Sequence, residues 1–228
     1  GDEMRREVIL LAAERKLIDD HLNILTTAGL SPVAIDAAPG ALSRCLTPRV
    51  EDTTDAQAKV IIDVGYASTK VLLSRNGRVI FFKLIPVGGR QLNETVSHHL
   101  NMSIDDAAEV RGRISNQAAD ETDKPLFGST RRETVQRAVY EATRATVEEL
   151  SKEIGLCLRY FSVTFRGRRP ESACLVGGES RAPHIAELLS EHAGVAITPA
   201  PIFDAIDTTD VGDVIPAPAE LPDWAGAI

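Results

Sequence analysis

Residues 59–69 read KVIIDVGYAST, an apolar run that ends in an acidic residue and continues into a glycine turn with two hydroxyl side chains. The pattern predicts a strand over residues 59–63, a turn over 65–68 and a returning strand over 69–74. Backbone N–H groups of such a turn can face a phosphate, and Asp63 could hold Mg²⁺ or its water shell. Alone, this DxGxxST pattern is weak evidence for a site, because a hairpin that begins with an acidic residue explains it equally well.

A second glycine-rich segment follows another apolar run. Residues 172–176 predict a buried strand, and Gly177-Gly178 come directly after it. Glycines at such a place let a flat ligand approach the backbone closely. In isolation, a plain strand-to-helix turn is the simpler explanation of this pair.

The chain begins with alternating predicted strands and helices. The continuous apolar run over residues 8–13 predicts a buried strand, and apolar residues at helical spacing predict a helix over 17–25 that ends at Gly29. Residues 32–35 predict a short strand, and residues 39–46 predict a short helix that starts at a proline. A polar, acidic stretch follows and predicts a linker to a second unit.

The second unit combines a hairpin with helical patterns. Asn76-Gly77 is the strongest short hairpin signal in the chain, and Ser103 is predicted to cap the start of a helix. The remaining predicted elements are a strand over 79–85, helices near 91–101 and over 104–113, a loop over 116–128, a long helix over 131–163, a helix over 183–192 and a strand over 195–198.

The composition excludes several classes of protein. The 228 residues are 43% hydrophobic, which excludes a disordered chain, and no apolar run approaches the ~18–20 residues that cross a bilayer. A formal net charge of −8 argues against a general nucleic-acid binder. Three separated cysteines form no CxxC pair, so a zinc ribbon or a disulfide scaffold is not indicated, and a reducing, cytoplasmic compartment is expected. Gly1 in place of Met indicates a piece of a longer protein.

Several short motifs occur together in a characteristic order. They are AGL at residues 28–30 with AID at 34–36, the strand and turn IIDVG at 61–65, PVGGRQL at 86–92, ELSKEI at 149–154 followed by LRYF at 158–161, and LVGG at 175–178. In this order they resemble the actin-like ATPase fold. More narrowly, they resemble the PilM family of cytoplasmic type IV pilus assembly proteins, which is related to the division protein FtsA.

The resemblance implies an α/β protein with the actin-like ATPase (ribonuclease H-like) fold, built of two lobes of mixed sheet with helices. Residues 1–48 would be part of an incomplete first lobe that includes the family's insert subdomain, residues 49–57 the linker, and residues 58–228 the second lobe. The family binds ATP and Mg²⁺ between its lobes. By resemblance, the residues that would bind them are Asp63, Gly65, Ser68 and Thr69 in a phosphate loop with Asp63 at the metal, Gly177 and Gly178 in the adenosine loop, and Glu153 on the ribose side.

The sequence departs from the family pattern in four places. The family's first phosphate loop lies upstream of the segments present here, and Tyr66 stands where a small residue usually follows the glycine turn. Leu156-Cys157 replace an Arg-Ser pair, and Glu179 replaces a small residue after the two glycines. Together these changes predict a degraded nucleotide site.

The resemblance also implies a function and a partner. We expect a scaffold of a type IV pilus, or of a related secretion or competence platform, at the inner face of the cytoplasmic membrane. A groove that includes residues 7–38 would bind the N-terminal tail of a PilN-like inner-membrane protein, which would hold the scaffold at the membrane, and self-association is possible. The alternative is an active ATPase or kinase of this fold, with its first phosphate loop upstream. An FtsA-like division protein would need a C-terminal amphipathic membrane helix, which the sequence does not contain.

Overall fold

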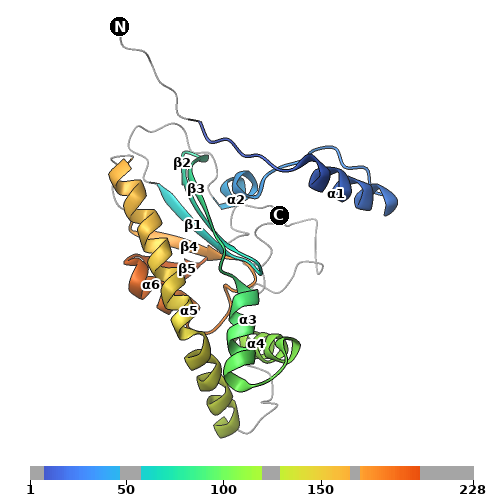
Figure 1. The fold of residues 1–228 in the computed structure, drawn as a ribbon. Coiled ribbons are helices and arrows are strands. Elements are labelled where there is room, and N and C mark those ends of the chain that lie inside the picture. The colour runs from blue at the N-terminus through green and yellow to red at the C-terminus, as the bar shows by residue number, and fades with distance from the viewer. Residues whose placement is uncertain (1–7, 47–57, 120–128, 165–169, 201–228) are drawn as a thin grey trace, which may run out of the picture.

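The computed structural model describes residues 8–46, 58–119, 129–164 and 170–200, and its centre is a mixed five-stranded sheet (Figure 1). The strand order is β3-β2-β1-β4-β5. Strand β1 runs antiparallel to β2 and parallel to β4, and β5 is parallel to β4. The strands are β1 (Lys59–Val64), β2 (Thr69–Arg75), β3 (Arg78–Ile85), β4 (Ser172–Val176) and β5 (Ala196–Pro199). This arrangement places the ends of β1 and β4, each followed by a glycine motif, side by side.

The hairpin between β2 and β3 follows directly from its sequence. Asn76 and Gly77 have φ angles of 52° and 69°, which are the left-handed values that a two-residue hairpin turn of type I′ requires. Asn and Gly tolerate these angles better than other residues. The predicted hairpin and its third strand are therefore confirmed.

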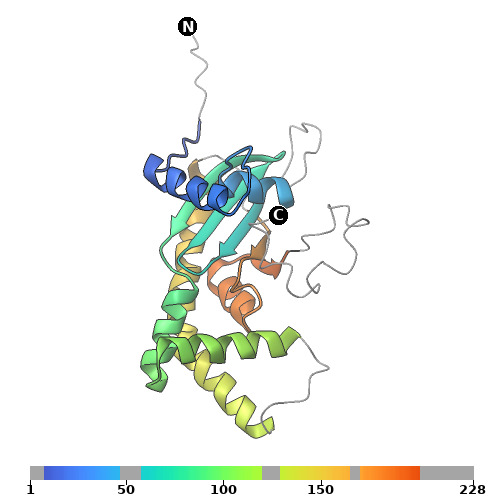
Figure 2. The ribbon, with the colours of Figure 1, turned by 90° about the vertical axis from the view of Figure 1, so that its right-hand side faces the viewer.

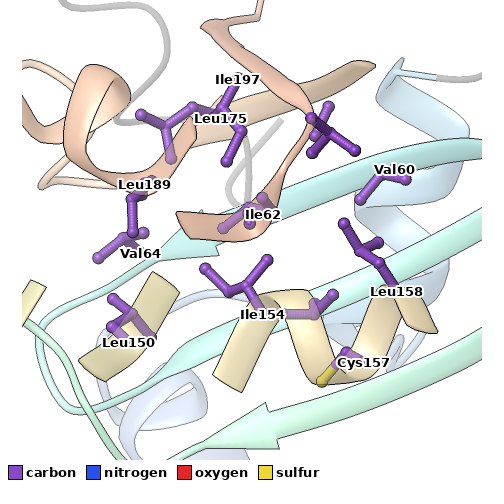
Figure 3. Packing of buried hydrophobic residues seen from close by; sticks show 14 of the residues in the cluster. Val60, Ile62, Val64, Leu150, Ile154, Cys157, Leu158, Leu175, Leu189 and Ile197 are labelled. Carbon is purple, nitrogen blue, oxygen red and sulfur yellow. The ribbon is translucent and has the colours of Figure 1, made fainter. Parts of the chain in front are cut away.

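Helices cover both faces of the sheet, and alternate residues of β1 supply the two sides of the core. Val60, Ile62 and Val64 pack toward α5 (Ser129–Thr164) and α6 (Ile185–Ala193) (Figure 3). On the other face, Ile61 packs with Leu42 of α2 (Ala38–Leu46). The buried stripe of α5 toward the sheet comprises Val147, Leu150, Ile154, Cys157, Leu158 and Phe161. A central strand buried on both faces agrees with the continuous apolar run from which it was predicted.

Beyond the end of the sheet, α3 (Gly89–Leu100) packs on the N-terminal half of α5, and α4 (Ile104–Ala119) packs on α3 (Figure 2). Their contact is a small cluster formed by Val96, Ala107 and Ala142. Ser103 caps α4 as predicted, because its Oγ accepts a hydrogen bond from the backbone N–H of Asp106. Helix α4 continues to Ala119, past the predicted end at residue 113, and the rest of the predicted loop lies outside the described residues.

The N-terminal segment differs from its prediction. Helix α1 (Arg15–Thr27) forms as expected and is followed by Gly29 at φ +80°, but residues 8–13 and 32–35 form no strand. A strand needs a neighbouring strand for its backbone hydrogen bonds, and the described residues provide none beside these two segments. Their apolar side chains are exposed, as at Leu10 and Val33. The predicted linker over residues 49–57 lies outside the described residues.

Candidate functional site

The turn between β1 and β2 is closed by its own backbone. The N–H of Gly65 donates a hydrogen bond to the carbonyl oxygen of Ser68 (3.1 Å). At the start of β2, the hydroxyl of Thr69 donates to the carbonyl oxygen of Val87 (2.7 Å). Tyr66, at the tip of the turn, is 63% exposed. The turn is thus fixed by hydrogen bonds to itself and to the segment before α3.

Helix α3 begins directly on this turn. The N–H groups of Gly89 and Arg90 donate to the carbonyl oxygens of Gly65 (3.0 Å) and Tyr66 (2.8 Å), respectively. A Cβ atom on Gly88 would lie 2.4 Å from the oxygen of Gly65, so the chain passes too close for any side chain. The first N–H groups of α3, which in other proteins can bind an anion, are therefore satisfied within the protein.

The structure brings the glycine motif after β4 to the same place. Gly177 has φ +93°, and a Cβ there would lie 2.4 Å from Oδ1 of Asp63. The N–H of Glu179 donates to the carbonyl oxygen of Val64 (3.2 Å), which fixes the loop against the end of β1. Around Gly178, in contrast, no atom of the described residues lies within 4 Å of the position of a Cβ. Asp63 and Gly177, which are far apart in sequence, are therefore direct neighbours.

Asp63 is already paired with a cation of the protein. Lys70 stands opposite Asp63 in the β1–β2 register, and its Nζ lies 2.5 Å from Oδ2 of Asp63. The side chains of Asp63 and Lys70 are only 11% and 25% exposed. A carboxylate held this closely by an ammonium group is not free to bind a divalent cation.

A cavity of about 500 Å³ lies between α3, α4, α5 and the start of α6. Its wall is formed by Leu92, Arg111, Ile114, Ser115, Glu133, Gln136, Arg137, Val139, Tyr140, Thr143, Val147, Ala182, Pro183, His184, Ile185 and Leu188. This volume is within the range of about 300–1,000 Å³ that is usual for small-molecule sites. An aromatic ring, a guanidinium and hydroxyl groups among apolar side chains could hold a small organic ligand.

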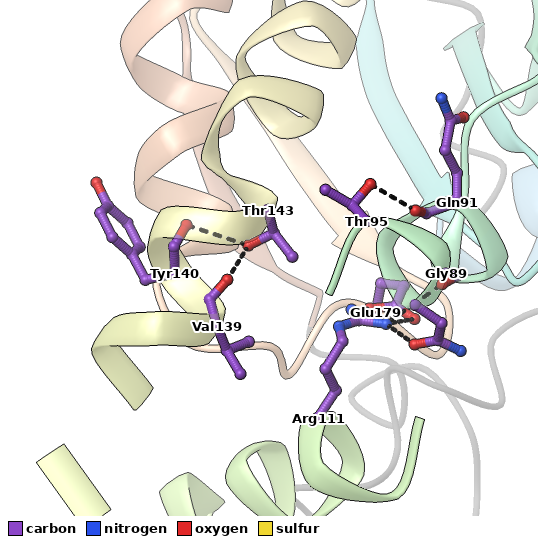
Figure 4. A network of polar contacts seen from close by, with 9 residues as sticks. Gly89, Gln91, Thr95, Arg111, Val139, Tyr140, Thr143 and Glu179 are labelled. Atoms are coloured by element: carbon purple, nitrogen blue, oxygen red, sulfur yellow. Dashed lines mark hydrogen bonds and ion pairs between the residues drawn. The ribbon is translucent and has the colours of Figure 1, made fainter. Parts of the chain in front are cut away.

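One cavity residue connects the cavity to the glycine motifs (Figure 4). The guanidinium of Arg111 forms an ion pair with Glu179 and donates hydrogen bonds to Oδ1 of Asn93 and to the carbonyl oxygen of Gly89 (3.3 Å). The side chains of Arg111 and Glu179 are 9% and 15% exposed. The acidic group at position 179, one of the four departures from the family pattern, is therefore neutralised by the protein itself.

Glu153 lies elsewhere on α5. It is exposed, its charge acts on the thiol of Cys157, and it is not among the residues that line the cavity. Burial of that thiol raises the pKa of Cys157 above its ordinary value. The structure thus brings Asp63, Gly65 and Gly177 together and leaves Glu153 on another side of the helix.

Sequence reasoning missed Lys70, Arg111 and Asn93. Lys70 had a signal, because a four-residue turn over 65–68 places residue 70 opposite Asp63. Arg111 had none, since its partner Glu179 is 68 residues away.

The residues at the turn do not fit ATP with Mg²⁺ in their present arrangement. Lys70 holds the carboxylate that would bind the metal ion or its water shell. Among the described residues, no group of three or more His, Cys, Asp or Glu side chains could hold a metal ion. The cavity, in contrast, has the size and lining for a small organic ligand.

One family and several known proteins are similar to this chain. A sequence model described as type IV pilus assembly protein PilM matches residues 1–213. Cell division protein FtsA of Bacillus subtilis (strain 168) is 22% identical over 198 residues, which are 84% of this chain and 44% of FtsA. The solved PilM-PilN type IV pilus biogenesis complex has a TM-score of 0.73 at 25% identity, over 94% of this chain and 56% of that chain. Ethanolamine utilization protein EutJ from Carboxydothermus hydrogenoformans has a TM-score of 0.63 at 14% identity, over 95% of this chain and 61% of its own.

These similarities confirm the predicted actin-like ATPase fold of mixed α/β type. The chain spans about half the length of these two relatives, 44% of FtsA and 56% of the chain in the PilM-PilN complex. No helix in the described part of the chain has the length and apolar character needed to cross a membrane.

Proposed function

The chain belongs to the PilM family of type IV pilus assembly proteins, and we propose that it acts as a scaffold for a pilus, or for a related secretion or competence platform. In this role it binds the cytoplasmic N-terminal tail of a PilN-like inner-membrane protein. The likeness to the PilM-PilN complex over 94% of the chain supports this partner. The scaffold then associates with the cytoplasmic face of the inner membrane through its partner, and copies of it can associate with one another.

An apolar groove along α1 is the observation that supports tail binding most directly. The groove has a volume of about 280 Å³ and is formed by Leu17, Ile18, His21, Leu22, Leu25, Pro32, Ala34 and Ile35. Helix α1 has no buried residue, and Leu17 and Ile35 are 57% and 62% exposed. Apolar side chains at helical spacing along a groove are typical of sites that bind a short peptide segment.

A binding titration tests this proposal. A fluorescently labelled peptide of the partner's N-terminal tail is titrated with the purified protein and with two variants. Leu25→Asp places a charge in the groove and should weaken binding by about tenfold or more, because apolar anchors dominate such interfaces. Asn23→Asp adds the same charge to the same helix outside the groove and should leave the affinity within about twofold. Absence of binding by the unchanged protein, or equal loss in both variants, would count against the scaffold role.

A degraded nucleotide site is the second part of the proposal. The Lys70–Asp63 pair at the turn and the ion pair of Glu179 with Arg111 support it, because both acidic groups are satisfied within the protein. A ligand stabilises the folded protein only when its concentration is comparable to its Kd or higher, so with a degraded site millimolar Mg-ATP should leave the melting temperature unchanged. A shift of several degrees would contradict this part of the proposal and leave the docking role intact.

The alternative function is that of an active ATPase or kinase with the same fold. The cavity of about 500 Å³ beside the glycine motifs favours it, because such a cavity could hold the base of a nucleotide. In that case Asp63 would organise Mg²⁺ for phosphoryl transfer after release from Lys70. Phosphate release from ATP that disappears in Asp63→Asn would support the enzyme, and its absence in the purified protein would favour the scaffold.

A further inference from the structure

The position of Lys70 relative to the turn suggests a specific role for its ammonium group. Lys70 faces Asp63 directly across the β1–β2 pair, with 2.5 Å between Nζ and Oδ2. Nζ also lies 3.9 Å from the position that a Cβ on Gly65 would have. The ammonium is therefore at the mouth of the turn, beside the carboxylate that the sequence resemblance assigns to a metal ion.

The ion pair of Lys70 with Asp63 is largely shielded from solvent. Asp63 is 8% exposed as a residue, and its other carboxylate oxygen, Oδ1, lies close to Gly177 of the neighbouring loop. A buried carboxylate needs a counter-charge, which can come from a bound metal ion or from the protein. Lys70 provides that charge permanently, and a divalent ion placed on Asp63 would have to approach the ammonium at close range.

We propose that Lys70 takes the place of the divalent cation at Asp63 and excludes Mg²⁺ from it. The proposal deepens the proposed degradation of the nucleotide site, because it identifies the residue that prevents metal binding. A phosphate-bearing ligand at this turn meets an ammonium group of the protein instead of a metal ion. Removal of Lys70 leaves a buried, uncompensated carboxylate, and this creates a site for Mg²⁺ or Mn²⁺.

An ordinary structural ion pair would behave differently. If the pair only stabilised the hairpin, Lys70→Met would lower the melting temperature, and divalent cations would not restore it. If Lys70 stands in for a metal ion, Mg²⁺ restores the lost stability, and the restoration requires Asp63. Both explanations therefore predict a lower melting temperature for Lys70→Met, but only the second predicts that Mg²⁺ restores it.

The test uses the purified protein, Lys70→Met, the double variant with Asp63→Asn and Lys70→Met, and the control Lys83→Met. Lys83 is an exposed lysine on β3 and lies outside the pair. Melting temperatures are compared in MgCl₂ and in KCl of equal ionic strength, with and without ATP, and bound Mn²⁺ is measured by electron paramagnetic resonance. At a Mg²⁺ concentration about ten times its Kd, the melting temperature of Lys70→Met should be roughly 3–5 °C higher in MgCl₂ than in KCl.

The expected result is that only Lys70→Met gains stability from Mg²⁺ and binds Mn²⁺, whereas the unchanged protein, the double variant and Lys83→Met do neither. If Lys70→Met does not fold in KCl, Lys70→Thr is tested beside it, and recovery of either variant in MgCl₂ supports the proposal. Mg²⁺-dependent stabilisation or Mn²⁺ binding by the unchanged protein overturns it. The proposal is also overturned if Mg²⁺ stabilises neither Lys70→Met nor Lys70→Thr. Tail-peptide binding is measured separately, so failure of this proposal is distinct from failure of the scaffold role.

Discussion

Replacement of Arg111 by methionine should destabilise the protein by about 3–5 kcal/mol, because it leaves the carboxylate of Glu179, whose side chain is only 15% exposed, without its partner. Arg111 is 9% exposed, and its guanidinium also donates hydrogen bonds to Asn93 and to the carbonyl oxygen of Gly89. Methionine retains much of the aliphatic volume, so the loss comes from the polar contacts. These contacts connect α4 to α3 and to the loop after β4, which are three separate parts of the fold.

The loss is large enough for a simple unfolding experiment. For a protein of this size, 1 kcal/mol corresponds to roughly 2–4 °C in melting temperature, so Arg111→Met should melt about 10 °C lower. Arg113→Met is the matched control on the same helix. Its partner Glu109 is four residues away, and the two side chains are 52% and 59% exposed. Such exposed pairs contribute about 0.5 kcal/mol or less, and the control should melt within about 2 °C of the unchanged protein.

A double variant separates the ion pair from the packing around it. When Arg111→Met is combined with Glu179→Leu, neither charge is left unpaired, and the free energy of unfolding should recover part of the loss. Urea unfolding followed by circular dichroism gives the four free energies that the cycle requires. Two results would refute the reasoning. One is equal stability of Arg111→Met and Arg113→Met, and the other is a double variant whose change in free energy equals the sum of the two single changes.

The backbone, a buried hydroxyl and a buried thiol provide three further tests. Gly177→Ala should cost about 2–4 kcal/mol in urea unfolding, because its Cβ would lie 2.4 Å from Oδ1 of Asp63 at φ +93°, whereas Gly178→Ala should stay within about 1 kcal/mol. Ser151→Ala should cost about 1–2 kcal/mol by the same measurement, since its buried hydroxyl donates a hydrogen bond of 2.6 Å to a carbonyl oxygen of α6. Cys157 should react with iodoacetamide in urea but not in the native protein at neutral pH, as mass spectrometry can show, because burial raises its thiol pKa and lowers the thiolate fraction.

The sequence predicted those elements whose cause lies within a few residues. The left-handed angles at Asn76 and Gly77 and the cap at Ser103 are local properties, and both appear where the sequence placed them. The two strands predicted over residues 8–13 and 32–35 are wrong for the opposite reason. A continuous apolar run indicates that a segment can be buried, but a strand also needs a partner with free backbone groups, and a single segment cannot reveal it.

The candidate site also has features with a local cause and features that depend on tertiary packing. Asp63 and the glycine motifs were identified from their own patterns, and the pairing of Asp63 with Lys70 follows from the length of the turn between them. The pairing of Arg111 with Glu179 depends on how α4 packs beside the loop after β4, which no local pattern encodes. For this reason the sequence alone could not reveal that Glu179 has a buried counter-ion, Arg111.

The two ion pairs have a common consequence for the proposed scaffold. Arg111 and Glu179 hold α4 against the loop after β4, and Lys70 and Asp63 neutralise the neighbouring turn. A ligand that bridged these parts would stabilise them by RT ln(1 + [L]/Kd), so the stability of their arrangement would vary with the ligand concentration. Ion pairs within the chain stabilise the same arrangement at every ligand concentration. These internal charges therefore fix α4, the loop after β4 and the neighbouring turn without a ligand, and nucleotide would have little remaining influence on their arrangement.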